Sequence, residues 1–81
     1  MKEIRWSARA SDDLNSLDRA IARRIRDGLR RYAETEHGDV IRLQGGAGTL
    51  RLRIGGRVLF ENLPDGQIRI VRVLYRSDAY R

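Results

Sequence analysis

Apolar residues alternate with polar ones at the start of the chain and then change to a helical spacing. Ile4 and Trp6 alternate with charged neighbours, so residues 2–7 are predicted to form a short strand with one buried face. Further along, apolar side chains recur every three or four positions: Leu14, Leu17, Ile21, Ile25, Leu29 and Tyr32. This spacing is typical of a helix that buries one stripe, and the arginines between these residues fall on the solvent-facing side.

The helical stretch can be read as two helices or as one. Three residues offer side-chain oxygens and negative charge suited to a helix start: Ser11, Asp12 and Asp13. Because Asp18 can cap a second helix, we predict a helical hairpin, about 9–17 and 19–35, with one long helix as the alternative. Gly28 is expected where the second helix packs closely against a sheet. Gly38 is expected to end that helix in a left-handed conformation.

A glycine-rich stretch, residues 38–49, separates the predicted helices from the rest of the chain. It is expected to form a flexible loop. A loop that binds nucleotide phosphates ends in Lys-Ser or Lys-Thr and follows an apolar strand, and this stretch has neither feature. The sequence therefore argues against a phosphate-binding loop here.

Beyond this loop, three strands are predicted: residues 50–54, where apolar residues alternate with arginines, the return strand 57–61, and residues 68–74. Gly55 and Gly56 predict a hairpin between the first two, because both residues accept positive φ. A turn at residues 62–66 leads to the third strand. That strand is apolar on both faces, which favours an interior position in the sheet.

The predicted order is β-α-α-β-β-β, an α+β fold in which a helical hairpin packs on one face of a small, mostly antiparallel sheet. Arg51 and Arg53 point away from their apolar neighbours in the strand, so we expect them on the open face. With 81 residues, the chain has room for one domain, residues 1–81, around one core.

Positive charge is concentrated in the second half of the chain. The formal net charge is +6. Residues 1–41 carry nine bases and eight acids, whereas residues 42–81 carry eight bases and three acids, a net charge of +5. Such a field favours a phosphate backbone or an acidic protein as the partner. The alternative is a general preference for arginine that serves solubility.

Composition excludes several kinds of chemistry. The chain has no cysteine, so disulfides, thiol nucleophiles and thiolate metal sites are ruled out. The single histidine, His37, falls at the predicted helix end, and no metal or other cofactor is expected. No apolar run is long enough to span a membrane and the N-terminus does not resemble a signal peptide, so a cytoplasmic protein is expected.

The residues that remain as candidates for chemistry are arginines and one tyrosine: Arg51, Arg53, Arg57, Arg76, Tyr80 and Arg81. Guanidinium groups bind phosphate bidentately, and a cluster of them can stabilise the charge that develops on a phosphate under attack. In RNA the neighbouring 2′-hydroxyl is a built-in nucleophile, so cleavage needs no metal. Tyr80 could stack on a base or transfer a proton. It could also simply pack the tail.

At these positions the sequence resembles the RelE/ParE superfamily of bacterial type II toxins. LRLRIGGRVLFE at residues 50–61 is similar to the family's paired central strands, and IVRVLYRSDAYR at residues 70–81 is similar to its last strand and tail. GDVIRLQG at residues 38–45 matches a common form of the connection before the hairpin. The resemblance implies a compact sheet with two helices on one side. It also implies a cognate antitoxin, which we expect to be acidic.

The resemblance implies one of two activities. RelE-like members cut messenger RNA in the ribosomal A site, whereas ParE-like members inhibit DNA gyrase and lack the RNA-cutting residues. Arg57 matches the RelE-like arginine that opens the return strand, and Arg76 and Tyr80 match the arginine and tyrosine of the RelE-like tail. These matches favour a ribosome-dependent endoribonuclease. A non-catalytic RNA-binding module is a further alternative.

On the RelE-like branch, each residue has an expected role. Arg57 and Arg76 neutralise the scissile phosphate, and Tyr80 orients the nucleotide or transfers a proton. The remaining candidates hold flanking phosphates: Arg51, Arg53 and Arg81. Two positions depart from the family pattern, because Gly56 stands where an aromatic residue is usual and Tyr75 stands where a histidine or another basic residue is common.

Overall fold

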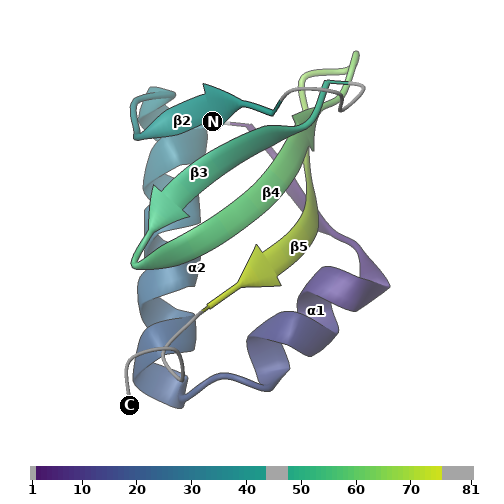
Figure 1. Cartoon of the computed structure of the whole chain (residues 1–81). Helices are drawn as coiled ribbons and strands as arrows, with labels where there is room; N and C mark the ends of the chain where they lie inside the picture. The colour runs from purple at the N-terminus through teal and green to yellow at the C-terminus, as the bar shows by residue number, and fades with distance from the viewer. Residues whose placement is uncertain (1, 44–47, 76–81) are drawn as a thin grey trace.

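The computed structural model describes residues 2–43 and 48–75 (Figure 1). Its elements, in chain order, are β1 (Ile4–Trp6), α1 (Ala8–Asn15), α2 (Arg19–Thr35), β2 (Val40–Arg42), β3 (Leu50–Ile54), β4 (Gly56–Asn62) and β5 (Ile68–Leu74). The strands form one five-stranded sheet in the order β1-β5-β4-β3-β2. β1 and β5 are parallel, and the other neighbouring strands are antiparallel. In Figure 1, α2 lies behind the sheet and α1 lies beside β5.

The predicted α+β fold, with a helical hairpin against a mostly antiparallel sheet, is confirmed. The chain forms two helices because Asp18 caps the second one: its carboxylate accepts a hydrogen bond from the Ala20 N–H at 3.3 Å. The strand predicted at residues 68–74 coincides with β5, which lies inside the sheet between β1 and β4. Neither described helix is both long enough and apolar enough to cross a membrane.

The core lies between α2 and the sheet. Its fully buried large side chains come from α2, β4 and β5: Ile25, Leu29, Val58, Phe60, Ile68 and Ile70. The rings of Phe60 and Tyr32 meet edge to face with centroids 5.3 Å apart, a favourable aromatic geometry. Gly28 allows α2 to approach β3, because a Cβ there would lie 2.6 Å from Cγ2 of Ile54. The predicted role of this glycine in close packing is therefore confirmed.

The start of α1 differs from the prediction. Ser7 is the N-cap, and its hydroxyl oxygen accepts a hydrogen bond from the Ala10 N–H at 3.0 Å. Asp12 and Asp13, predicted to begin the helix, lie inside it instead. Ser7 is the better cap because it directly follows β1, whereas the later residues are already in helical conformation.

The left-handed residue that follows α2 also differs from the prediction. Glu36, rather than Gly38, adopts the left-handed conformation, with φ of 58°. The helix ends at Thr35, as predicted, where the Thr35 hydroxyl donates to the Arg31 carbonyl at 3.0 Å and accepts from the His37 N–H at 3.1 Å. Gly38 instead permits a close approach, since a Cβ there would lie 2.9 Å from a methyl group of Leu52.

The predicted loop at residues 38–49 contains a strand. β2 pairs antiparallel with β3, with Val40 opposite Leu52 and Arg42 opposite Leu50. The two apolar residues of this strand, Val40 and Ile41, are adjacent and do not alternate with polar ones, so the sequence shows no strand pattern and the surrounding glycines indicate a loop. In the β3–β4 hairpin, Gly55 has positive φ (66°), whereas Gly56 already belongs to β4.

A bulge in β5 determines which of its side chains are buried. Leu59 pairs with Arg72 while the next residue, Phe60, pairs with Ile70, so Val71 is skipped in the register between β4 and β5. Without this extra residue, the apolar positions at the two ends of β5 would point to opposite faces. The bulge therefore keeps both ends of the strand in the core.

The outer edge of β5 is completed by side chains from α1. β1 pairs only with the first three residues of β5, and the chain then turns into the helix. The Ser7 N–H donates to the Ile70 carbonyl at 3.0 Å, and the Ser7 hydroxyl donates to the Val71 carbonyl at 2.9 Å. Ser7 thus caps the helix and also occupies the strand edge where β1 stops.

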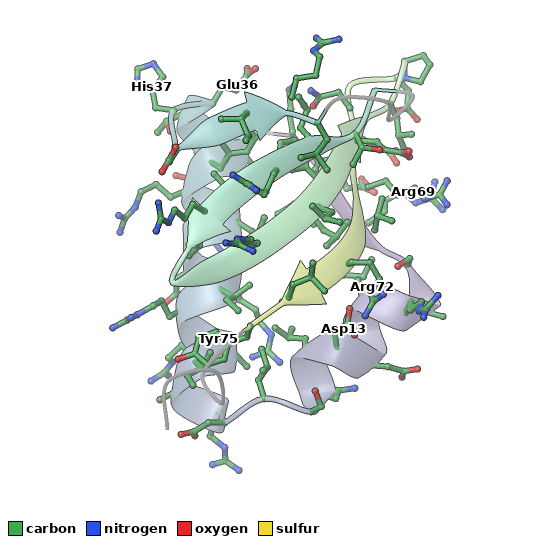
Figure 2. All side chains as sticks on the ribbon, viewed as in Figure 1. Asp13, Glu36, His37, Arg69, Arg72 and Tyr75 are labelled. Atoms are coloured by element: carbon green, nitrogen blue, oxygen red, sulfur yellow. The ribbon has the colours of Figure 1, made fainter. Side chains whose placement is uncertain are left out.

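Asp13 holds the next part of that edge. Its Oδ2 accepts a hydrogen bond from the Val73 N–H at 2.9 Å and another from Nε of Arg72 at 2.7 Å. Its Oδ1 accepts from Nη2 of Arg72 at 3.2 Å. Figure 2 shows the two labelled side chains meeting between α1 and β5. We call this arrangement the Asp13 clamp: the Asp13 carboxylate with the Arg72 side chain and the Val73 amide.

The clamp stabilises the folded state only while the carboxylate is charged. The hydrogen bond from Arg72 lowers the pKa of Asp13, with a further contribution from the Val73 amide, while burial acts in the opposite direction. A carboxyl whose pKa is lower in the folded than in the unfolded state stabilises the fold above the unfolded pKa of about 3.9. This stabilisation is lost as pH falls through the folded pKa.

Substitution Asp13→Asn should therefore lower the free energy of unfolding at pH 7 by about 1–3 kcal/mol, because a neutral amide cannot accept both donors as strongly. The measurement is urea unfolding of wild type, Asp13→Asn and Asp12→Asn, the control being an exposed residue of the same helix. The difference in free energy of unfolding between wild type and Asp13→Asn should shrink below pH of about 4, whereas that between wild type and Asp12→Asn should not. A difference that stays constant across this pH range would contradict an ionic clamp.

Candidate functional site

The open face of the sheet collects arginines from four strands. Strand register aligns the outward-facing positions in three rows across the sheet. The rows are Arg53–Arg57–Leu74, Ile41–Arg51–Leu59–Arg72, and Glu61–Arg69–Arg5. In Figure 1 this is the face directed away from α2. Five of the described arginines of the second half therefore lie on one surface: Arg51, Arg53, Arg57, Arg69 and Arg72.

Arg53 and Arg57 lie directly opposite one another beside the Gly55 turn, and both are exposed. Side chains at such positions are only about 5 Å apart at Cβ, so two like charges there are destabilising unless an anion lies between them. Arg51 is two positions away on the same face of β3. Among the residues that the structure describes, none of these three arginines forms an ion pair. Their donors are available to a ligand.

A hollow of about 410 Å³ opens beside Arg57, where β4 begins and β5 ends. It is lined by Asp13, Ser16, Leu17, Arg57, Arg72, Val73, Leu74 and Tyr75. The Asp13 clamp forms one wall. The predicted strand arginine, Arg57, therefore stands at a concave site, and the chain leaves that site towards the tail through Tyr75.

The two departures from the family pattern are one structural feature. A Cβ on Gly56 would lie 2.7 Å from the Leu74 carbonyl oxygen and 3.1 Å from Cδ1 of Tyr75. Tyr75 therefore passes directly over Gly56, and its ring occupies space that a side chain at position 56 would need. An aromatic ring stands beside Arg57 in this way, although it comes from the residue that follows β5 rather than from β4.

Three predicted site residues, Arg76, Tyr80 and Arg81, lie outside the described residues, so their roles stay predictions. Arg72 lines the hollow, although it is not among the site residues predicted from the sequence. Its partner Asp13 lies 59 positions away in the sequence, and no local pattern signals the pair. The Asp13 hydrogen bond raises the pKa of Arg72, so this guanidinium stays charged but its charge is compensated.

The described part of the chain offers no site for a metal ion built from three or more histidine, cysteine or carboxylate side chains. His37 is exposed just after α2 (Figure 2).

Comparison with known families identifies the chain. A family model described as "ParE toxin of type II toxin-antitoxin system, parDE" matches residues 4–80. The chain belongs to this toxin family. The predicted membership of the RelE/ParE superfamily is thereby confirmed. A search of curated protein sequences finds no significant match to the toxin.

Solved structures similar to the toxin share its fold. The RelBE2 toxin–antitoxin complex from Mycobacterium tuberculosis has 26% identity and a TM-score of 0.72, covering 93% of this chain and 98% of that chain. The YoeB dimer from Staphylococcus aureus has 20% identity and a TM-score of 0.73, covering 93% and 97%. The isolated RelE toxin from Escherichia coli has 16% identity and a TM-score of 0.75, covering 99% and 92%.

Substitution Gly56→Ala should destabilise the toxin by about 2 kcal/mol, because the added methyl group meets a backbone carbonyl that cannot move without shifting β5. Gly38→Ala is the matched control, since its nearest neighbour is the flexible end of Leu52, 2.9 Å away. We expect Gly38→Ala to lower the free energy of unfolding by less than about 1 kcal/mol. Urea unfolding measures both variants, and equal losses would show that the contact between Gly56 and Tyr75 is not tight.

Proposed function

We propose that this toxin, acting as a single domain over residues 1–81, is a metal-independent endoribonuclease that cuts messenger RNA on the ribosome. The observation that supports the proposal most directly is the placement of Arg51, Arg53 and Arg57 on one face beside the hollow. Such a surface can hold consecutive phosphates of one strand and concentrate positive charge on one of them.

The proposed reaction uses the RNA as its own nucleophile. The 2′-oxygen forms a bond to the adjacent phosphorus, the bond from phosphorus to the 5′-oxygen breaks, and a proton passes from the 2′-hydroxyl side to the 5′-oxygen side. Arg57 and Arg76 would stabilise the additional negative charge on the phosphate, and Tyr80 would orient the nucleotide or transfer a proton. Arg51, Arg53 and Arg81 would hold flanking phosphates.

The hollow contains no effective general base among the residues described. Its one carboxylate is Asp13. Asp13 is engaged by Arg72 and Val73, and its lowered pKa makes it a poor acceptor of a proton. Alignment of the 2′-hydroxyl with the phosphate must then provide much of the acceleration. The ribosome would supply that alignment in the cytoplasm, so free RNA should be a poor substrate.

We infer that an acidic antitoxin neutralises the toxin, in keeping with the antitoxin present in the similar complex from M. tuberculosis. Two large apolar side chains, Ile41 and Leu74, are exposed on the same face as the arginines. A segment that combines carboxylates with apolar residues would complement this pattern. Opposite charge would mainly accelerate association.

A gyrase inhibitor without nuclease chemistry is the second candidate, and the description of the matching family as ParE toxins favours it. Such a toxin would block DNA supercoiling and leave messenger RNA intact. A non-catalytic RNA-binding module would do neither and would not arrest growth.

Substitution Arg57→Ala should reduce cleavage of ribosome-bound message roughly 100-fold, because it removes a charge placed to stabilise the transition state. The measurement is primer extension on messenger RNA after induced expression and in a purified translation system, with gyrase supercoiling assayed in parallel. Arg30→Ala is the control, an exposed arginine on α2. Cleavage at the wild-type rate by Arg57→Ala would refute the assignment, and gyrase inhibition with intact message would support the ParE-like alternative.

A further inference from the structure

A second pair of like charges lies at the opposite corner of the open face. Arg5 of β1 pairs in register with Arg69 of β5, and both side chains are exposed. Figure 2 shows Arg69 extending outward at the end of the sheet away from Tyr75. Two guanidinium groups on neighbouring strands repel one another unless something negative lies between them. This pair joins two parallel strands, whereas Arg53 and Arg57 face one another across an antiparallel hairpin.

The acidic and polar neighbours of this pair compensate its two charges only in part. Arg5 donates from Nη1 to Oε1 of Gln67 at 3.4 Å, which is a long contact with a neutral group. Glu61 is the register partner of Arg69, but within residues 2–43 and 48–75 the two form no ion pair. Most donors of both guanidinium groups are therefore free to bind an anion.

The pair borders a hollow of its own. This hollow has a volume of about 320 Å³ and is lined by Arg5, Trp6, Ser7, Leu63 and Arg69. Two cations beside Leu63 suit a nucleotide, whose phosphate is charged and whose base and ribose are less polar, whereas the Trp6 side chain packs against the core side of the strand. A simple inorganic anion would use only the arginines.

The separation between the two arginine pairs fits a short length of one RNA strand. Leu74 opposes Arg57, and it lies five residues beyond Arg69, one of which is taken up by the bulge. Four strand rises correspond to roughly 13 Å. At about 3.4 Å per stacked nucleotide, this distance spans about four nucleotides, and fewer if the strand is extended.

The charge between the pairs is weaker because Asp13 compensates Arg72. We propose that Arg5 and Arg69 form a second phosphate-binding subsite, which holds the same single-stranded RNA a few nucleotides away from the phosphodiester at Arg57. The inference rests on the proposed RNA-directed function and extends it, because it makes substrate length a determinant of binding.

The test uses the purified full-length toxin and RNA oligonucleotides of three and eight nucleotides, with 2′-O-methyl groups that prevent cleavage. Fluorescence anisotropy at several salt concentrations gives the affinity for each. Wild type should bind the longer oligonucleotide more tightly. The double variant Arg5→Gln, Arg69→Gln should lose about tenfold for eight nucleotides and stay within about twofold of wild type for three. Its salt dependence for the longer RNA should decrease by about 1.4 in slope, the value for two phosphates on a single strand.

The control is the double variant Arg30→Gln, Arg31→Gln, which removes the same charge from exposed positions of α2. It should bind both oligonucleotides within about twofold of wild type, which separates a local subsite from a general effect of net charge. Equal losses in the two double variants would overturn the proposal. So would a wild type that binds three and eight nucleotides equally, or a loss confined to antitoxin binding.

Cleavage is measured separately on ribosome-bound message, so the two proposals can fail independently. If wild type cuts no message but the double variant Arg5→Gln, Arg69→Gln binds the longer RNA more weakly as expected, the nuclease proposal is refuted and the subsite is retained. A toxin that cuts message and binds RNA independently of Arg5 and Arg69 would retain the nuclease and refute the subsite.

Discussion

The hydrogen bonds that the Asp13 carboxylate accepts hold the end of β5 on which the candidate site depends. β1 is too short to cover the whole edge of β5, so the strand would otherwise expose unpaired backbone groups beside the hollow. α1 supplies the missing partners through two side chains, Ser7 and Asp13. The bulge at Val71 lies where β1 stops covering the edge of β5 and the residues of the helix begin to cover it. The same contacts fix Arg72 and set the path by which Tyr75 leaves the sheet.

This clamp also divides the charge on the open face. Arg72 has a carboxylate partner, whereas Arg53 and Arg57 face one another without one among the described residues. Direct opposition of like charges lowers stability, and proteins accept such a loss mainly where a ligand later relieves it. Repulsion between Arg53 and Arg57 therefore destabilises the sheet at a place where the same two charges could bind a phosphate. An antitoxin or an RNA strand would each supply the missing negative charge.

Most of the fold could be predicted from the sequence because its long elements carry regular patterns. The apolar stripe of α2, the alternation in β3 and the apolar run of β5 identify these elements directly. β2 was missed because its two apolar residues, Val40 and Ile41, are adjacent and do not alternate with polar ones, and its pairing with β3 is a tertiary effect. The cap of α2 at Asp18 was predicted, but the start of α1 was misassigned because residues 11–13 offer capping side chains as suitable by type as that of Ser7. The left-handed residue after α2 was misassigned because glutamate is an unusual type for that position.

The candidate site could be predicted only in part, because some of its side chains are placed by local alternation along a strand and others by contacts between residues far apart in the sequence. Alternation along β3 was sufficient to place Arg51 and Arg53 on the open face. The clamp joins residues 59 positions apart, so it becomes visible only when α1 is placed beside β5. Likewise, Gly56 and Tyr75 look like two separate departures in the sequence, yet the absence of one side chain makes room for the other. When the site of this toxin is compared with that of another family member, the space that the side chains fill should be compared, and not only the residue at each aligned position.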